Sequence, residues 1–413
     1  MESYCIQDVR KLRKQKNYAK AYEILSQYDD FGIGEAPALL EKAHILSEET
    51  RYAECENVLQ EVSALGGQSG ALAKFRLVRL YSKVNDDSAY QNMMVRELFH
   101  DVSPTLAKIF ASDSFVSRLT TPIAGGHIIA SRVHSGGRKH IFEKVRRRGP
   151  SSSHEVDINE VISSLDLCQD SISPRYYCSH KSDNYVSMFF DDVMPSRCDF
   201  VSQRVDICML IARYHRAHDL QILRNGIPLC EKITLDAKKK PSIRTVCSLA
   251  NQLGKGATVE HGVMQLQELG FSCANTFGID HMRSFFEIIS NESVQNLLNE
   301  NPIVLQHGDL NKTNILFSDR FDSPRIIDWE VAGPGLFGYD FGYFLSHQNV
   351  QFNELVMLCE FIGKKYDENY PNVMFAIVFY FLLCSSFLNT GWVKSGGKDT
   401  FIRASELLES WVS

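Results

Sequence analysis

Two polar motifs that directly follow apolar, strand-like runs constrain this chain more than any other feature of its sequence. The first, HGDLNKTN, begins at His307, and the second, RIIDWE, contains Asp328. Asp328 lies nineteen positions after Asp309 of the first motif. This spacing fits two short strands joined by a turn over Ser318 to Ser323, so we expect both carboxylates to face one site.

A pair of carboxylates in this arrangement suits the transfer of a phosphoryl group from ATP to a hydroxyl. The reaction needs Mg²⁺ to neutralise phosphate charge, a cation on the phosphates, and a carboxylate beside the attacking hydroxyl. Asp309 could supply that carboxylate, and Asn314 and Asp328 could supply the oxygen ligands that Mg²⁺ prefers. For Asp309 taken alone, an ordinary turn at the end of a strand is the alternative interpretation.

Taken together, the two motifs resemble a known family. HGDLNKTNILF followed by IIDWE is similar to the catalytic loop and the metal-binding strand of the aminoglycoside phosphotransferase/choline kinase family, whose members are relatives of protein kinases. The downstream segment GPGLFGYDFGYFL resembles the place where that family carries a structural aspartate, here Asp340. The upstream segment LIARYHRAHDL resembles the helix before the catalytic region. The resemblance runs from about Phe115 to the C-terminus.

The resemblance implies a role for each residue of the two motifs. Asp309 would be the catalytic base or the group that orients the hydroxyl, and His307 would brace the loop. Asn314 and Asp328 would hold Mg²⁺. The sequence departs from the family at residues 311–313, Asn-Lys-Thr, where His-Pro-Gly is frequent. That departure leaves the metal and base positions intact and affects the contacts on the substrate side.

The nucleotide site that the resemblance implies lies in a small β-rich lobe. Gly125 and Gly126 would let the backbone approach the phosphates, although a plain hairpin turn explains them equally simply. Lys144 would contact the α- and β-phosphates; the alternative is the start of a solvated basic loop. A carboxylate from the next helix would hold this lysine, and we expect it to be Glu160, with Glu155 as the rival.

The edge of the nucleotide pocket is expected along the strand from Tyr185 to Phe190. The main chain of Asp191 and Val193 would pair with the adenine base there. These contacts use backbone atoms, so the side chains at the two positions neither support nor exclude them. Whether the donor is ATP or GTP is left open by the sequence.

The first hundred residues fall outside the resemblance and repeat with a period of 34 residues. The pattern predicts pairs of helices, for example residues 37–48 followed by 52–63, and it resembles the tetratricopeptide repeat. Stacked hairpins of this kind would share one core. A generic helical bundle is the alternative. The recurring positions are Tyr18 and Tyr52, Leu25 and Leu59, and Leu12, Leu46 and Leu80.

Strands first and helices second predict an α+β fold with two lobes. We expect helical repeats over residues 1–110, a kinase-like N-terminal lobe over 111–194 and a kinase-like C-terminal lobe over 195–413. A helix is expected near residues 157–167, and GPGLFG at 333–338 is expected to be a packed loop. The expected strands are residues 119–123, 127–134, 140–145, 175–179, 185–190, 302–306, 314–317 and 325–327.

Composition places the chain among folded proteins and argues against nucleic-acid binding. The net charge is −6, whereas a general nucleic-acid binder is normally basic. The scattered cysteines and the lack of a signal peptide predict a cytoplasmic protein. The apolar run from Val373 to Leu388 is shorter than the ~20 residues that a membrane-spanning helix needs, so we expect a buried helix and no transmembrane segment.

The sequence therefore predicts an ATP- and Mg²⁺-dependent phosphotransferase acting on a hydroxyl of a small molecule or glycan. An amino alcohol, an aminoglycoside and a sugar are all open as substrates, because a fold does not fix specificity. The helical repeats would bind a protein partner or a second copy of the chain. The alternative is a kinase-like binding or scaffold protein with weak catalysis, recruited through those repeats.

Overall fold

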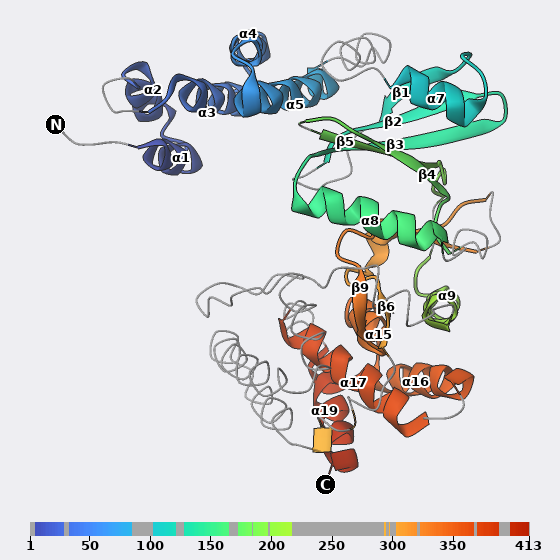
Figure 1. Cartoon of the computed structure of the whole chain (residues 1–413). Helices are drawn as coiled ribbons and strands as arrows, with labels where there is room; N and C mark the ends of the chain where they lie inside the picture. The colour runs from blue at the N-terminus through green and yellow to red at the C-terminus, as the bar shows by residue number, and fades with distance from the viewer. Residues whose placement is uncertain are drawn as a thin grey trace. The chain divides into compact units, whose positions relative to one another are not determined.

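The fold is known from a computed structural model of the chain, shown in Figure 1. The structure describes residues 5–28, 33–84, 102–120, 128–164, 172–183, 185–196, 199–216, 293–294, 297, 303–319, 323–366, 370–387 and 397–412. The chain divides into two compact units. The first contains residues 1–152 and 177–192, and the second contains residues 153–176 and 193–413.

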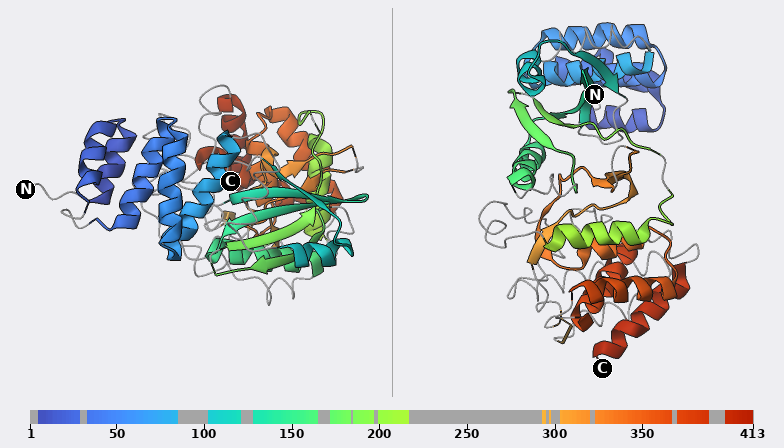
Figure 2. Two further views of the ribbon diagram at one scale, coloured as in Figure 1. Left: turned by 90° about the horizontal axis from the view of Figure 1, so that it is seen from above. Right: turned by 90° about the vertical axis from the view of Figure 1, so that its right-hand side faces the viewer.

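The first unit begins with a row of amphipathic helices. Their leucines at the repeated positions 25, 46, 59 and 80 are buried between neighbouring helices. Tyr18 and Tyr52 begin α2 and α4, so the helices agree with the predicted hairpins, while their assignment as tetratricopeptide-like stays a prediction. The left view of Figure 2 shows the helices side by side. They are α1 (Ile6–Lys14), α2 (Tyr18–Ser26), α3 (Glu35–Glu48), α4 (Tyr52–Ala64) and α5 (Gly67–Val84).

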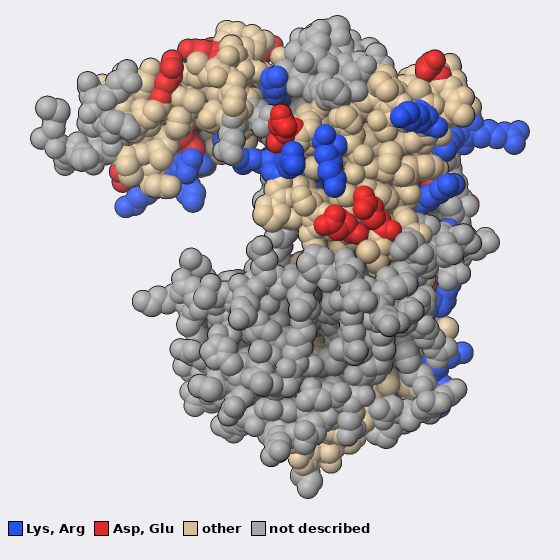
Figure 3. All heavy atoms as spheres, viewed as in Figure 1, with Lys and Arg blue, Asp and Glu red and all other residues tan. Residues whose placement is uncertain are grey.

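A five-stranded sheet of order β1-β2-β3-β5-β4 completes the first unit. The β1–β2, β2–β3 and β3–β5 pairs are antiparallel. Helix α7 (Ser103–Phe110) packs on one face, where Val102 and Leu106 meet Ile141 and Phe189. In the view of Figure 3, the surface formed by the described residues carries both basic and acidic side chains. The strands are β1 (Val116–Thr120), β2 (Ile128–Gly136), β3 (Lys139–Arg147), β4 (Tyr176–Lys181) and β5 (Tyr185–Asp191).

The second unit is mostly helical and is built around one large apolar core. Among the residues that the structure describes, its helices are α9 (Arg204–Arg216), α15 (Tyr339–Ser346), α16 (Phe352–Tyr366), α17 (Tyr370–Phe387) and α19 (Lys398–Val412). Helix α8 (Pro150–Ser164) begins in the first unit and continues in the second. Helix α17 is apolar on all sides and is buried along residues 373–385, as predicted. Among the described residues, no helix is long and apolar enough to cross a membrane.

Two short strand pairs in the second unit carry the polar motifs. Strand β6 (Ile303–Gln306) pairs with β9 (Gly333–Leu336), and β7 (Ile315–Leu316) pairs with β8 (Arg325–Ile326), both antiparallel. The prediction of a loop over residues 333–338 was therefore wrong for its first four residues. Gly333 and its neighbours form a strand because β6 offers them a partner that only the tertiary fold supplies. The helices, the antiparallel sheet and the strand pairs together make the predicted α+β fold.

Candidate active site

The loop that follows β6 turns sharply at its second residue. Gly308 has φ +82°, a left-handed conformation that glycine adopts without steric cost. The backbone N–H of His307 donates to Asp340 Oδ2 at 2.8 Å, and the N–H of Gly308 donates to Asp340 Oδ1 at 3.0 Å. One carboxylate of α15 therefore holds both peptide groups of the turn.

Asp340 is completely buried and is also bonded from α9. Its Oδ2 accepts a hydrogen bond from the Tyr214 hydroxyl, and His215 Nε2 lies 3.3 Å from the same oxygen. Burial alone would raise the pKa of Asp340, but the hydrogen bonds from His215 and Tyr214 help to lower it overall. Burial lowers the pKa of His215 in turn. The His215 side chain thus lies against this carboxylate.

His307 braces the loop from within. Its Nε2 lies 2.8 Å from the Ile327 carbonyl, its Nδ1 lies 3.3 Å from the backbone N of Asp309, and its ring lies 4.8 Å from that of Trp329. The neutral tautomer with the proton on Nε2 satisfies both contacts, because Nδ1 then accepts from Asp309. The His307 side chain therefore links the loop of residues 307–314 to the segment that leads to Asp328.

Asp309 is half-buried and is surrounded by donors. Its Oδ1 accepts from the Tyr343 hydroxyl at 2.7 Å and from Asn311 Nδ2 at 2.8 Å. Asn314 Nδ2 donates to the Asp309 carbonyl at 2.8 Å and lies 3.3 Å from Oδ2. Because its amino group is used in this way, the atom that Asn314 would offer to a cation is its amide oxygen.

The β7–β8 pair brings together Asn314 and Asp328, the candidate metal ligands. The N–H of Ile327 donates to the Asn314 carbonyl at 2.9 Å, which draws the two motifs together. Asp328, one residue later, has φ +67°, a left-handed conformation that is costly for a residue other than glycine and is concentrated at functional sites. Carboxylate oxygens of Asp328, Glu330 and the buried Glu155 lie within 4.8 Å of one another. Three hard oxygen ligands at this spacing fit a divalent cation such as Mg²⁺.

The candidate residues of the first unit occupy defined places in the sheet. Lys144 lies on β3 opposite Ser131 and Met188. Because side chains alternate along a strand, Lys144 is on the face opposite Ile141, the residue that packs against α7. The Asp191 side chain is on the α7 face, where its Oδ1 accepts from Tyr177 at 2.6 Å.

The structure distinguishes the other expected site residues by their surroundings. Glu160 is exposed, whereas its rival Glu155 is 1% exposed and belongs to the carboxylate cluster. The chain passes from one unit to the other between Asp192 and the buried Val193. Gly125 and Gly126 lie outside the described residues.

Sequence reasoning missed two contacts of the candidate base. Asn311 was noted only as a departure from the family, although an amide two residues after the aspartate can reach its carboxylate. Tyr343 was not singled out, since 34 residues separate it from Asp309. Its position three residues after Asp340, almost one turn along the same helix, was the available signal.

Comparison with known proteins identifies the family. A model of the choline/ethanolamine kinase family matches residues 134–377, more than half of the chain. The chain therefore belongs to the choline/ethanolamine kinase family, and it is a small-molecule kinase with a hydroxyl acceptor. The match includes the Asp309, Asn314 and Asp328 segment. No curated protein sequence matches the chain significantly.

Several solved structures are similar to the chain at low sequence identity. An ethanolamine kinase of Plasmodium vivax is 14% identical, with a TM-score of 0.45, covering 84% of this chain and 95% of its own. A putative fructosamine-3-kinase of Haemophilus somnus 129PT is 16% identical, with a TM-score of 0.41 and coverages of 74% and 96%. An aminoglycoside phosphotransferase in ternary complex with ADP and hygromycin B is 13% identical, with a TM-score of 0.43 and coverages of 75% and 97%.

Proposed function

We propose that this protein transfers the γ-phosphoryl group of ATP, in the presence of Mg²⁺, to the hydroxyl of an amino alcohol. The family match supports the reaction class and this substrate class. The single observation that carries the mechanism is the arrangement around Asp309. The half-buried carboxylate of Asp309 lies on a loop held by Asp340, and Asn314, a candidate metal ligand, donates to the Asp309 carbonyl at 2.8 Å and lies 3.3 Å from the carboxylate.

In the proposed reaction, Asp309 orients the acceptor hydroxyl and takes its proton as the new O–P bond forms and ADP leaves. Asn314 and Asp328 would hold the cation, with Glu330 close enough to contribute a further oxygen. A bound Mg²⁺ would neutralise the charge on the phosphates. Lys144 would bind the phosphates, and the carboxylate that holds it is proposed to be Glu160, with Glu155 as the rival.

The nucleotide is proposed to pair with the main chain near Asp191 and Val193, and the phosphates to approach Gly125 and Gly126. We propose the same domain division as above, with helical repeats over residues 1–110 preceding lobes over 111–194 and 195–413. The repeats are proposed to bind a protein partner or a second copy of the chain, in the cytoplasm.

The test is acceptor-dependent formation of ADP by the full chain, with choline, ethanolamine, an aminoglycoside and a sugar supplied separately. We expect turnover with choline or ethanolamine, and a loss of about 10²–10⁴-fold in Asp309→Ala. Turnover confined to the aminoglycoside or the sugar would overturn the amino-alcohol proposal and keep the phosphotransferase. Absence of turnover with every acceptor would favour the scaffold alternative.

A further inference from the structure

The two oxygens of the Asp309 carboxylate have different surroundings. Oδ1 accepts two short hydrogen bonds, from the Tyr343 hydroxyl at 2.7 Å and from Asn311 Nδ2 at 2.8 Å. Among the described residues, Oδ2 has one longer contact, 3.3 Å from Asn314 Nδ2, a group that already donates to the Asp309 carbonyl at 2.8 Å. The carboxylate is thus fixed through Oδ1 and leaves Oδ2 with spare acceptor capacity.

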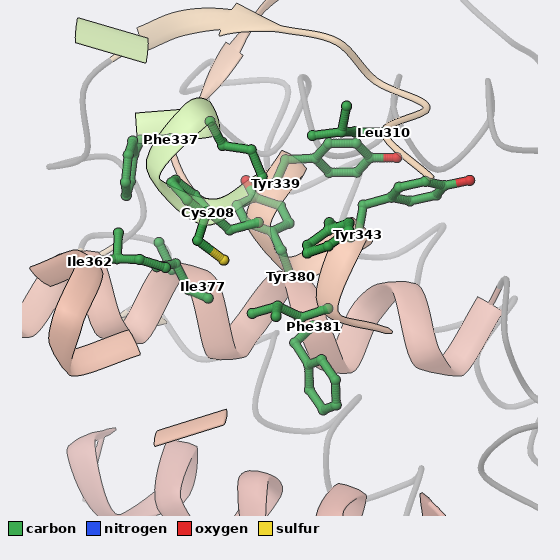
Figure 4. Packing of buried hydrophobic residues seen from close by; sticks show 14 of the residues in the cluster. Cys208, Leu310, Phe337, Tyr339, Tyr343, Ile362, Ile377, Tyr380 and Phe381 are labelled. Atoms are coloured by element: carbon green, nitrogen blue, oxygen red, sulfur yellow. The ribbon is translucent and has the colours of Figure 1, made fainter. Parts of the chain in front are cut away.

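The Tyr343 side chain is held in place by burial and by packing against neighbouring rings. Its side chain is 1% exposed, on α15, the helix that also carries the loop anchor Asp340. The ring stacks on Tyr339 at 5.9 Å between centroids and lies 4.6 Å from the ring of His347. Figure 4 shows the Tyr339 and Tyr343 rings extending in the same direction from α15. A buried ring packed against two neighbouring rings loses little further freedom when its hydroxyl binds a partner.

The hydroxyl of Tyr343 stays protonated and therefore acts as a donor. Burial raises the pKa of Tyr343 far above its usual value, and the charge of Asp309 and the hydrogen bond to it raise the pKa further. A phenol that donates to a carboxylate makes a charge-assisted hydrogen bond, which is about twice as strong as one between neutral groups.

We propose that Tyr343 is a positioning residue for phosphoryl transfer: together with Asn311 it fixes Oδ1 of Asp309, so that Oδ2 is the oxygen that takes the proton of the acceptor hydroxyl. The inference rests on the proposed function. In the step, the acceptor O–H bond breaks as its oxygen bonds to the γ-phosphorus, the proton moves to Oδ2, and the bond to the β–γ bridging oxygen breaks to release ADP.

The kinetic test compares Tyr343→Phe with Tyr380→Phe in the full chain. Tyr380 is an equally buried tyrosine that packs against Tyr339, 5.7 Å between ring centroids, so its variant controls for the loss of a buried hydroxyl in the same cluster. With choline or ethanolamine as acceptor, we expect Tyr343→Phe to lower kcat about tenfold or more, with KM for ATP unchanged. Asn311→Ala should change kcat in the same direction. Equal kcat values for Tyr343→Phe and Tyr380→Phe would overturn the inference.

A second measurement does not depend on turnover. The denaturation midpoints of Tyr343→Phe, Asp309→Ala and the double variant form a cycle that isolates the contact between the two side chains. We expect the shift of the double variant to be smaller than the sum of the single shifts. Additive shifts would overturn the inference. A non-additive cycle in a protein with no acceptor turnover would overturn the proposed function and leave the contact standing.

Discussion

Asp340 accepts hydrogen bonds from both peptide groups of the catalytic turn and from Tyr214, and His215 lies beside it. The charge is fully buried, so its removal leaves these donors without a partner in a place that water does not reach. We expect Asp340→Ala to lower the free energy of unfolding by about 3–5 kcal/mol. It should also abolish acceptor turnover, because the loop that carries Asp309 loses its anchor.

Chemical denaturation checks this prediction, with Asp399→Ala as the matched control. The Asp399 side chain is 79% exposed on α19, and its carboxylate lies 3.9 Å from Arg403. A surface substitution of this kind should change stability by less than about 0.5 kcal/mol. Equal effects of the two substitutions would contradict the role given to Asp340.

Glu143 forms a second buried charge network, in the sheet of the first unit. It contacts Arg132 at 2.5 Å and His134 Nε2 at 3.0 Å, and Ser117 Oγ lies 2.7 Å from the other ring nitrogen. Burial raises the pKa of Glu143, but the charges and hydrogen bonds of Arg132 and His134 outweigh it and lower the pKa strongly. This contribution to stability is therefore complete above the ordinary glutamate pKa and is lost as the pH falls toward the depressed value.

The pH dependence of unfolding tests this network. As the pH falls below about 4.5, the ordinary glutamate pKa, the wild type should lose stability more steeply than Glu143→Gln, although the variant is the less stable of the two at pH 7. Midpoints of urea denaturation at several pH values measure both quantities. Identical slopes for the two proteins would show that Glu143 does not hold its charge in the folded state.

At the scale of elements, α15 and α17 approach each other closely at Gly342. A Cβ on this residue would lie 2.5 Å from the backbone N of Phe381 and 2.6 Å from the carbonyl carbon of Tyr380. Both are backbone atoms of a buried helix and cannot move aside. We expect Gly342→Ala to cost about 1–3 kcal/mol of stability or more, and to lower turnover because α15 carries Asp340 and Tyr343.

Gly333→Ala is the control, since a Cβ at Gly333 meets nothing within 4 Å. Thermal unfolding of the two variants under the same conditions provides the comparison. If Gly342→Ala unfolds at the temperature of Gly333→Ala, the close packing of α15 on α17 does not exist in solution.

The helices and strands that could be predicted from the sequence are those with a local pattern of apolar residues. The sheet strands of the first unit lie within a few residues of their predicted bounds, because each shows apolar character bounded by turns. Helix α8 begins at Pro150, seven residues before the expected start, because its first turns are polar and carry no apolar signal. Strand β9 was missed because only its pairing with β6 makes it a strand.

The residues of the candidate site likewise divide into those that are close in sequence and those that only the fold brings together. Residues 307–314 were recognisable because they lie on one loop, in which Asp309 contacts His307 two positions before it and Asn314 five positions after it. Tyr343 reaches Asp309 only through the packing of α15. Glu155 was the rival choice to Glu160, and its place beside Asp328 depends on a fold that brings residues 155 and 328 together. Contacts of this kind have no signature in a single sequence.

At the scale of the whole molecule, a kinase-like region follows a row of helices that the family match does not include. The helices bury their own apolar faces in two clusters, which is the behaviour of stacked hairpins. We predict that a fragment of residues 1–101 retains a protein partner, or a second copy of the chain, in a pull-down. Recovery of neither would remove the recruiting role from the repeats and leave the kinase proposal intact.

The central claim is that Asp328 helps to hold Mg²⁺ for a bound nucleotide, and calorimetry of ATP binding tests it most directly. The wild type should bind ATP in the presence of Mg²⁺ and bind it much more weakly after chelation. Asp328→Ala should lose the Mg²⁺-dependent component of ATP binding. Asp309→Ala should retain it, because Asp309 acts on the acceptor hydroxyl and not on the nucleotide. Metal-dependent binding that survives in Asp328→Ala, or no binding by the wild type, would contradict the account.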